Sequence, residues 1–490
     1  MAMTESEVVK LSDQLGPVDY LMHRGEANPR TRSGIMALEL LDTTPDWDKF
    51  LTRFENASRR VLRLRQKVVV PTLPTASPRW VVDPDFNLEF HVRRMRVAEP
   101  GTLRDVFNLA EVILQSPMDI SRPLWTATLV EGLAGGKAAT LLHVSHAVTD
   151  GVGGVQMFAE IYDLERDPSA KPTPPLPIPQ DLTANDLMRQ GINHLPTAVV
   201  GGVLSAVSGA VSAAGRAVLE PGATVSGIVG YAMSGMRVLN RAAEPSPLLR
   251  RRSLATRTEA IDIPLSDLHK AAKAGGGSIN DAYLAGLCGA LRRYHEALGV
   301  PISTLPMAVP VNLRADADTA GGNRFTGVNL AAPVGTVDPV SRMKKIRAQM
   351  TQRRDEPAMN IIGSVAPLLS VLPTAVLEGI TGSVIGSDVQ ASNVPVYPGD
   401  TYIAGAKVLR QYGIGPLPGV AMMVVLISRG GWCTITVRYD RASVRNEPLF
   451  AQCLLEGFDE ILALAGDSAP RAVPASFAEP ATSARTASGS

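Results

Sequence analysis

The chain has 490 residues, and its 48 basic and 47 acidic side chains leave a net charge of +1. This balance excludes a global electrostatic attraction to nucleic acid or to an anionic membrane. Hydrophobic residues make up 45% and charged residues 19%, which predicts a globular protein long enough for two domains. The three cysteines are widely spaced and the N-terminus has no apolar run. We therefore expect reduced thiols, no signal peptide and a cytoplasmic protein.

The first 180 residues alternate predicted strands with predicted helices. Apolar residues that alternate or run continuously predict strands. These strands are expected at residues 86–93, 125–130 and 138–144. Apolar residues at helical spacing predict helices at residues 106–113 and 155–162. The strand at 138–144 is nearly all apolar, so it belongs in the centre of a sheet. We place an N-terminal domain over residues 1–180, closed by a proline-rich stretch at 172–179.

Residues 181–250 are predicted to connect two domains. No Asp, Glu, Lys or Arg occurs between residues 190 and 215, and small residues recur every four positions from Gly201. This spacing lets helices approach closely, so we expect a hairpin of two small-residue helices within residues 196–240. A transmembrane span is disfavoured because Ala, Gly and Ser dominate the segment. Two placements stay open, a helix pair packed in water or a hairpin lying in a membrane interface.

Residues 251–466 are predicted to form a second α/β domain. Its strands are expected at residues 258–263, 307–313, 403–409, 420–427 and 433–439. Its helices are expected at residues 279–298, 361–385 and 448–464. The tail over residues 467–490 is rich in Ala, Ser, Pro and Thr and is expected to be disordered.

One histidine stands out as a candidate base. His146 follows the buried strand and precedes a helix, within residues 143–151, which read HVSHAVTDG. Loops at the mouth of a sheet often carry catalytic groups. The residues alone also permit an ordinary loop histidine, with Asp150 capping the next helix. His143 lies three positions away, which on a strand is the opposite face, so a metal site is disfavoured and no metal is expected.

Known nucleophile and nucleotide motifs are missing from the sequence. No GxSxG nucleophile elbow occurs, and the glycine clusters complete neither GxGxxG nor a P-loop.

A series of short motifs makes the chain resemble the bacterial wax ester synthase/diacylglycerol acyltransferase family, one group of the CoA-dependent acyltransferases that carry HHxxxDG or HxxxD. The motifs are residues 15–19 (LGPVD), Trp80 with residues 91–93, the stretch Arg122, Pro123, Leu124 and Trp125, residues 146–151 ending in Gly151, Asn280 with Asp281, residues 310–314 ending in Arg314, and residues 392–395 with Asn393. They span nearly the whole chain in family order, which is more specific than any single motif.

The resemblance implies a fold and a reaction. The fold is an α/β sandwich of two chloramphenicol-acetyltransferase-like domains with an active-site channel between them. The reaction moves a fatty acyl group from acyl-CoA to diacylglycerol, or to a long-chain alcohol to give a wax ester. His146 is the implied general base, and acyl-CoA is a co-substrate, with no further cofactor. Asp150 is implied to be structural, with Arg122 and Arg314 as candidate partners.

One departure from the family pattern bears on the site. The family has two adjacent histidines, and here Ser145 replaces the first while His146 keeps the second. Base catalysis is therefore retained, whereas the rate and the preferred acceptor are open.

Supporting motifs have structural interpretations as well. Asp281 stands three residues after Ser278, a capping-box position, so helix initiation is its expected role. Trp125 begins a strand and is expected in the core rather than against substrate. Asn393 either lines the channel or holds a turn.

Two other functions remain alternatives. One is acyl transfer to another lipid or polyketide alcohol, and the other is a lipid-binding homologue with an impaired site, for which Ser145 is the only support. We expect lipid substrates, peripheral association with a membrane or lipid droplet, and no nucleic-acid partner.

Overall fold

The computed structural model describes residues 12–73, 75–149, 151–169, 172–194, 242–312, 325–354, 387–466 and 472–475. The predicted hairpin within residues 196–240 and the predicted helix at 361–385 lie outside these ranges. Within them, no helix has both the length and the apolar character needed to cross a membrane.

The first sheet has six strands in the order β11-β12-β1-β6-β5-β4. Its strands are β1 (Gly34–Leu41), β4 (Val92–Arg96), β5 (Trp125–Glu131), β6 (Ala138–Ser145), β11 (Tyr402–Ile403) and β12 (Ala406–Ile414). Antiparallel β1 and β5 flank β6, and all eight residues of β6 are buried, which confirms the predicted central strand. A small hairpin, β2 (Gln66–Val69) and β3 (Arg79–Val82), stands beside this sheet.

Helices of the first domain follow the predicted pattern in part. They are α1 (Pro17–Gly25), α2 (Trp47–Arg60), α3 (Leu88–His91), α4 (Leu103–Gln115), α5 (Gly151–Met157) and α6 (Ala184–His194). The predicted helix at 155–162 divides into α5 and a short 3₁₀ turn at Ala159–Ile161.

The predicted strand over residues 86–93 is wrong. Asn87 caps a single helical turn by accepting the Glu89 N–H (2.9 Å), and β4 begins only at Val92. His91 is drawn inward, where its ring stacks on Trp125 with centroids 4.7 Å apart. The alternation of apolar and polar residues therefore reflects aromatic packing around one turn rather than a pleated strand.

Two strands of the first sheet come from the second half of the chain. β11 and β12 lie within residues 251–466, yet β12 pairs with β1, placing Ile414 opposite Met36. The segment was assigned to the C-terminal domain, whereas its pairing places it in the N-terminal sheet. Ala404 and Gly405 form the two-residue turn between β11 and β12, and both have positive φ (47° and 87°), as such hairpin turns require.

The second sheet has seven strands in the order β15-β7-β14-β13-β10-β8-β9. They are β7 (Thr256–Pro264), β8 (Leu305–Asn312), β9 (Phe325–Ala332), β10 (Val389–Pro395), β13 (Met422–Arg429), β14 (Trp432–Asp440) and β15 (Val473–Pro474). The last strand corrects the prediction of a wholly disordered tail. It closes the free edge of β7, with the Ala475 N–H donating to the Ala260 carbonyl (2.9 Å).

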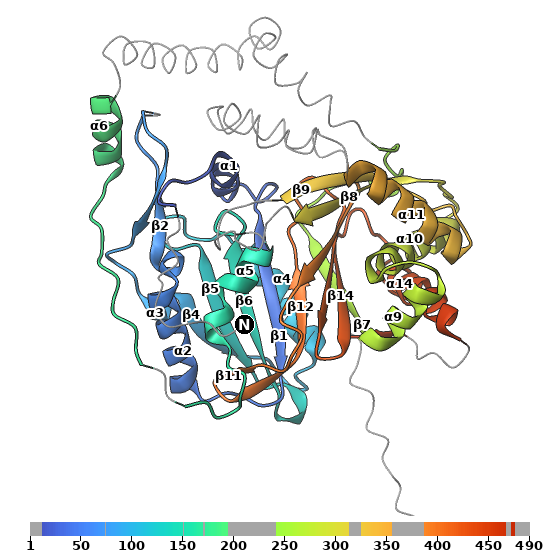
Figure 1. Cartoon of the computed structure of the whole chain (residues 1–490), viewed down its shortest axis with the longest axis horizontal. Coiled ribbons are helices and arrows are strands. Elements are labelled where there is room, and N and C mark those ends of the chain that lie inside the picture. Colours follow the sequence, from blue (N-terminus) through green and yellow to red (C-terminus); the bar gives the residue numbers. More distant parts are fainter. Residues whose placement is uncertain are drawn as a thin grey trace, which may run out of the picture.

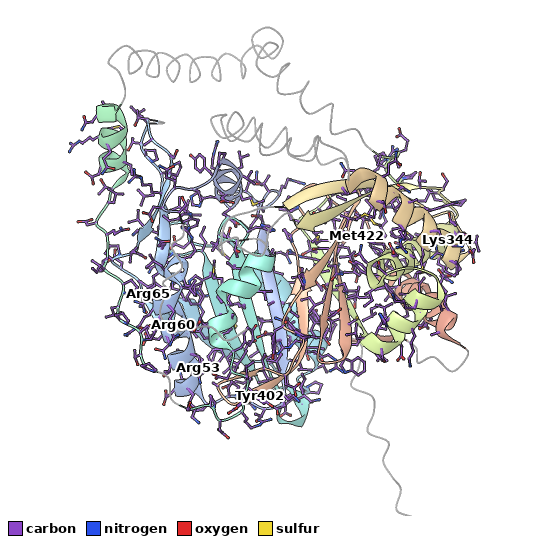
Figure 2. All side chains as sticks on the ribbon, in the orientation of Figure 1. Arg53, Arg60, Arg65, Lys344, Tyr402 and Met422 are labelled. Carbon is purple, nitrogen blue, oxygen red and sulfur yellow. The ribbon has the colours of Figure 1, made fainter. Side chains whose placement is uncertain are left out.

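Four helices cover the outer face of the second sheet (Figure 1). They are α9 (Leu265–Ala274), α10 (Ile279–Ala297), α11 (Pro339–Arg354) and α14 (Glu447–Leu462). α10 and α14 pack closely because they meet at glycines, and a Cβ on Gly457 would lie 2.4 Å from the Ala290 nitrogen. In Figure 2, Met422 lies within this sheet and Lys344 on the solvent side of α11.

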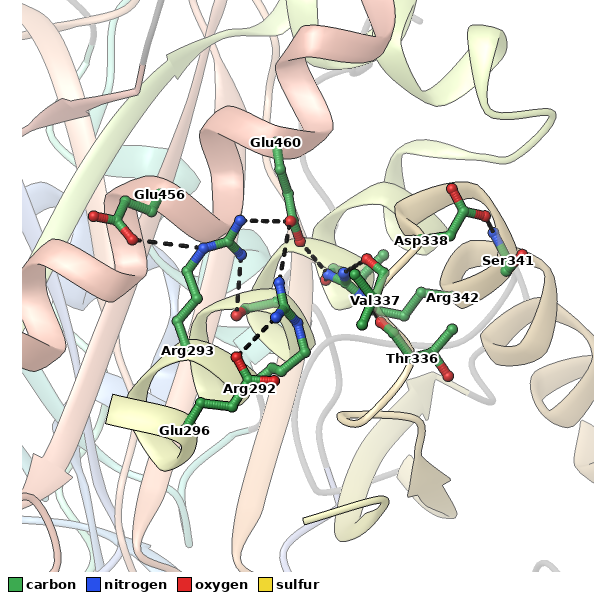
Figure 3. A network of polar contacts seen from close by, with 12 residues as sticks. Arg292, Arg293, Glu296, Thr336, Val337, Asp338, Ser341, Arg342, Glu456 and Glu460 are labelled. Atoms are coloured by element: carbon green, nitrogen blue, oxygen red, sulfur yellow. Dashed lines mark hydrogen bonds and ion pairs between the residues drawn. The ribbon is translucent and has the colours of Figure 1, made fainter. Parts of the chain in front are cut away.

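A buried arginine joins three of these helices. Arg342 of α11 is fully buried and pairs with Glu460 of α14, while its Nη1 also donates to the Ala285 carbonyl of α10 (2.7 Å). Its remaining nitrogens donate to two carbonyls before α11, so the charge has a complete set of partners (Figure 3). The helical layer is thus a rigid support on the side away from the first domain.

The two domains are joined along β12, which lies on the inner face of the second sheet. Side chains at alternate positions of β14 donate to alternate carbonyls of β12 and of the residue that follows it. The pairs are Thr434 to Gln411 (2.5 Å), Thr436 to Gly413, and Arg438 to Gly415 (3.4 Å). Gly413 permits the close approach, because a Cβ there would lie 2.8 Å from Val425. This ladder fixes the position of one domain against the other.

Candidate active site

His146 is held at the end of the central strand. β6 ends at Ser145, and the half-buried His146 follows directly. The His146 backbone N–H donates to the Ser33 carbonyl beside β1 (3.2 Å), and the Ser145 N–H donates to the Leu124 carbonyl beside β5 (3.0 Å). Both neighbouring strands therefore fix the peptide groups around His146.

Ser145 forms a buried hydrogen-bond cluster with Glu26. The Ser145 hydroxyl donates to Glu26 Oε1 (2.7 Å) and accepts the Ala147 N–H (3.2 Å). The same Oε1 accepts the N–H and the hydroxyl of Ser33 (3.4 and 3.2 Å). Glu26 is only 1% exposed, and burial, opposed by these hydrogen bonds, raises the pKa of its carboxyl. Ser145, which stands where the family has its first histidine, thus links the loop that carries His146 to the buried Glu26.

Sequence reasoning missed Glu26. It lies 119 residues from Ser145, and nothing in its neighbourhood distinguishes it from a surface acid. Its one signal is the departure at Ser145, because a small buried hydroxyl in place of an imidazole requires a new partner from elsewhere in the chain.

His143 is a core histidine. Its ring lies against Gly34, where a Cβ would stand 2.4 Å from Nε2. Burial, helped by the charges of Arg438 and Arg32, lowers the pKa of His143 to about 3, so the ring stays neutral. Among the residues the structure describes, no group of three His, Cys, Asp or Glu side chains is placed to hold a metal ion.

The three cysteines are buried thiols. Burial raises the pKa of Cys288 to about 12 and of Cys453 to about 11, and it also raises the pKa of Cys433. Because the thiolate is the nucleophilic form, none of them is suited to form a covalent acyl intermediate.

The Pro-Leu-Trp motif is part of the core around the site. Pro123, Leu124 and Trp125 are buried. The Trp125 indole N–H donates to the Leu64 carbonyl (2.7 Å), and its ring stacks with Phe54 and His91. The expected core role of Trp125 is confirmed, and the motif's contribution to the site is the Leu124 carbonyl that holds Ser145.

The proposed partners of Asp150 are only partly visible. Asp150 and Arg314 lie outside the described residues, while Gly151 is the first residue of α5. Arg122 pairs with Asp119 (3.3 Å), and its guanidinium lies 4.4 Å from the centroid of the Phe90 ring. The pairing of Asp150 with an arginine stays a prediction.

Asp281 initiates α10. Its carboxylate accepts the Ser278 N–H (2.8 Å), and its own N–H donates to the Ser278 hydroxyl (3.2 Å). This reciprocal capping box confirms the structural role predicted for Asp281. Asn280 is the second residue of the same helix and is partly exposed.

Asn393 lies in a strand near the segment that follows His146. It is exposed in β10 opposite Leu426, which excludes the turn, one of the two roles considered for Asn393. β10 pairs with β13 along its whole length, whereas its pairing with β8 covers only Val389 and Gln390 within the described residues. α5 contacts β10, so the structure brings the segment after His146 and the strand of Asn393 together across the two domains.

Comparisons with known proteins agree on one family. The chain matches the wax ester synthase/diacylglycerol acyltransferase catalytic domain over residues 6–283 and the WS/DGAT C-terminal domain over residues 321–462. A protein of Mycobacterium tuberculosis strain H37Rv, provisionally named a diacylglycerol O-acyltransferase, is 86% identical over 97% of each chain.

Solved structures share the fold. The wax ester synthase/diacylglycerol acyltransferase from Marinobacter aquaeolei VT8 has a TM-score of 0.62 at 20% identity, over 92% of this chain and 100% of that one. The first condensation domain of the calcium-dependent antibiotic synthetase has a TM-score of 0.57 at 14% identity, over 95% and 99% of the two chains. The expected fold of two chloramphenicol-acetyltransferase-like domains is confirmed. With its catalytic and C-terminal domains both matched, this chain belongs to the wax ester synthase/diacylglycerol acyltransferase family of acyltransferases.

Proposed function

We propose that the protein transfers a fatty acyl group from acyl-CoA to diacylglycerol, yielding triacylglycerol, with His146 as the general base. The observation that carries this assignment is the position of His146, half-buried directly after the central strand and fixed through backbone bonds to both neighbouring strands. The name of the 86% identical relative supports diacylglycerol as acceptor.

The reaction needs one proton carrier. The imidazole of His146 accepts the proton of the acceptor hydroxyl while that oxygen attacks the thioester carbonyl. The tetrahedral oxyanion then collapses, the C–S bond breaks, and the imidazolium returns its proton to the departing CoA thiolate. The new ester and free CoA account for every atom. Transfer is direct, and this agrees with the buried state of all three thiols.

The fixed loop contributes to this step through orientation. A base acts efficiently only when it lies within hydrogen-bond reach of the proton it removes. Ser145 and Glu26 hold the peptide on one side of His146, so little conformational freedom has to be lost when the alcohol binds.

The test is CoA release by purified protein with palmitoyl-CoA, offered dioleoylglycerol or hexadecanol separately. We expect turnover with dioleoylglycerol that is lost in His146→Ala. Turnover with hexadecanol alone would reassign the protein as a wax ester synthase. Bound lipid without turnover, in folded protein, would favour the lipid-binding alternative.

We further propose that the enzyme works at the surface of a membrane or lipid droplet. Diacylglycerol is too apolar to be delivered from water, and the uncharged stretch between residues 190 and 215 is a candidate for lipid contact. Deleting residues 196–240 should reduce flotation with dioleoylglycerol-containing liposomes more than it reduces CoA binding. Unchanged flotation would contradict this placement.

A further inference from the structure

A cavity of about 840 Å³ lies where the two domains meet. Its first wall is formed by residues 28–32 and 114–115 of the N-terminal domain. Its second wall comes from the later part of the chain, chiefly residues 250, 252–254 and 417–419 with parts of β14. The volume is in the range of cavities that hold a small-molecule ligand or cofactor.

Arginines dominate the charge of this cavity. Five of them line it, namely Arg30, Arg32, Arg250, Arg252 and Arg438. The acidic residues that line it are Glu244, Asp388 and Asp440. Asp388 and Asp440 are each only 3% exposed and accept backbone N–H groups of Ser246 (2.6 Å) and Ser253 (2.5 Å). Their charges are therefore partly used within the wall, and the cavity keeps a positive excess.

Two of the arginines are held in place by neutral groups. Arg32 donates to the carbonyls of Gln115 (2.6 Å) and Glu26 (3.3 Å). Arg252 donates to the carbonyl of Arg251 (3.0 Å), and its nearest carboxylate contact, with Asp388, is long at 3.9 Å. Carbonyl partners orient a guanidinium without neutralising it, so Arg32 keeps its charge for an anion, whereas Asp388 and Asp440 offset part of the charge of Arg252.

Two more arginines are free to reach a ligand. Arg30 and Arg250 are exposed, and no carboxylate among the described residues forms an ion pair with either side chain. Arg438 differs, because Glu111 pairs with it at 3.2 Å inside the domain interface. The ligand-facing charge is therefore carried by Arg30, Arg32, Arg250 and Arg252.

The cavity adjoins the backbone segment that binds the peptide group of His146. Arg32 immediately precedes Ser33, whose carbonyl accepts the His146 N–H. The charges of Arg32 and Arg438 also reach His143, three residues before His146. A ligand anchored on Arg32 would therefore lie beside the segment that fixes the backbone of His146.

We propose that this cavity binds the phosphate groups at the nucleotide end of acyl-CoA, the 3′-phosphate and the diphosphate. Planar guanidinium groups match phosphate oxygens in pairs, and several of them on two opposing walls suit a ligand with two separate phosphate centres. The pantetheine arm leads from there toward His146. The identity of the ligand rests on the proposed function, whereas the site for a multiply charged anion rests on the cavity alone.

Neighbouring arginines provide a matched test. Arg250 lines the cavity, whereas Arg251 beside it is also exposed but does not line it. Calorimetric titration with CoA should show binding weakened about tenfold in Arg250→Ala, the size expected for one charge-assisted contact, and unchanged in Arg251→Ala. Arg30→Ala should behave like Arg250→Ala. Dephospho-CoA should bind the wild type more weakly than CoA does.

The binding experiment is independent of turnover, so it is informative even if no acyl transfer is found. Where turnover is measured, Arg250→Ala should raise the KM for palmitoyl-CoA and leave kcat unchanged, and palmitoyl-pantetheine, which lacks the phosphates of CoA, should not distinguish the variant from the wild type. Equal CoA affinity in Arg250→Ala and wild type would overturn the proposal. So would a variant that keeps CoA binding but loses binding to phosphatidylglycerol vesicles, because the arginines would then recognise a lipid phosphate.

Discussion

Arg32 and Ser33 are consecutive residues that belong to two different environments. Ser33 joins Glu26 and Ser145 in a buried hydrogen-bond cluster beside the backbone of His146. Arg32 faces a cavity that is open to ligands and rich in guanidinium groups. The first region fixes the position of a base, and the second offers accessible charge. This difference implies that proton transfer by His146 and binding of acyl-CoA can be changed separately. The adjacent residues Arg32 and Ser33 nevertheless contribute to both regions.

Removing the base gives the largest expected effect. His146→Ala should lower kcat by about 10²- to 10⁴-fold, the usual contribution of general base catalysis. CoA affinity should stay unchanged, because the cavity does not include His146. Stopped-time assays of CoA release and calorimetric titration of the same protein check both parts. A variant that loses CoA binding along with turnover would show that the two regions are not separable.

Acid should lower the free energy of unfolding through the buried histidines of the N-terminal domain. Burial lowers the pKa of His23 and His91 to about 4 and of His143 to about 3, against an unfolded value of 6.5. Between those values the unfolded chain binds more protons than the folded one. The contribution of these histidines to the free energy of unfolding is therefore complete above pH 6.5 and is lost progressively as the pH falls toward 4.

The slope of this acid effect is at most about 4 kcal/mol per pH unit for three histidines. Glu26 and Glu39 oppose it, because burial raises the pKa of both carboxyls and the folded state then binds protons more readily. Urea unfolding at pH 7.5, 6 and 5 measures the net effect. We expect the three histidines to outweigh the two carboxyls, so an unfolding free energy that does not fall between pH 7.5 and pH 5 would contradict this balance.

The buried cluster should be sensitive to loss of one hydroxyl. Ser145→Ala leaves Glu26 and the Ala147 N–H short of a partner, which should lower the free energy of unfolding by about 1–3 kcal/mol. Loosening the loop should also reduce kcat. Ser121→Ala is a matched control, since Ser121 donates to Asp119 (2.6 Å) at an exposed site, and it should cost less than about 0.5 kcal/mol.

A double-mutant cycle isolates the hydrogen bond between Ser145 and Glu26. Ser145→Ala combined with Glu26→Ala should destabilise the protein by clearly less than the sum of the two single changes, with a coupling of about 1 kcal/mol or more. Purely additive losses in urea unfolding would mean that the 2.7 Å contact between the two side chains contributes nothing of its own.

Arg122→Ala should have the smallest effect. Its side chain is one-third exposed, and its ion pair with Asp119 and contact with Phe90 are each worth about 1 kcal/mol or less. Turnover should stay within about threefold of the wild type. A loss of kcat comparable to that of His146→Ala would instead support the predicted pairing of Arg122 with Asp150.

The sequence predicted those structural features that depend on residues close together in the chain. The apolar run of β6 and the Ser278–Asp281 capping box depend on residues close together in the chain, and both are confirmed. The return of β12 to the first sheet depends on pairing across more than 360 residues, for which the strand itself carries no signal. The alternation at residues 86–93 was misleading because one capped turn produces the same apolar spacing.

The candidate site divides in the same way. His146 was found because its motif is contiguous. Glu26 and the arginine cavity were missed because their members come from distant segments that only the fold brings together. A single-sequence reading has no access to such contacts, since each residue alone has the appearance of an ordinary surface charge.

The most direct measurement compares wild type, His146→Ala and Arg250→Ala in one assay with palmitoyl-CoA and dioleoylglycerol. The separation of chemistry from donor binding predicts that His146→Ala loses kcat while keeping its affinity for CoA, and that Arg250→Ala raises the KM for palmitoyl-CoA about tenfold with kcat unchanged. Turnover that survives in His146→Ala, or a loss of the same parameter in both variants, would contradict it.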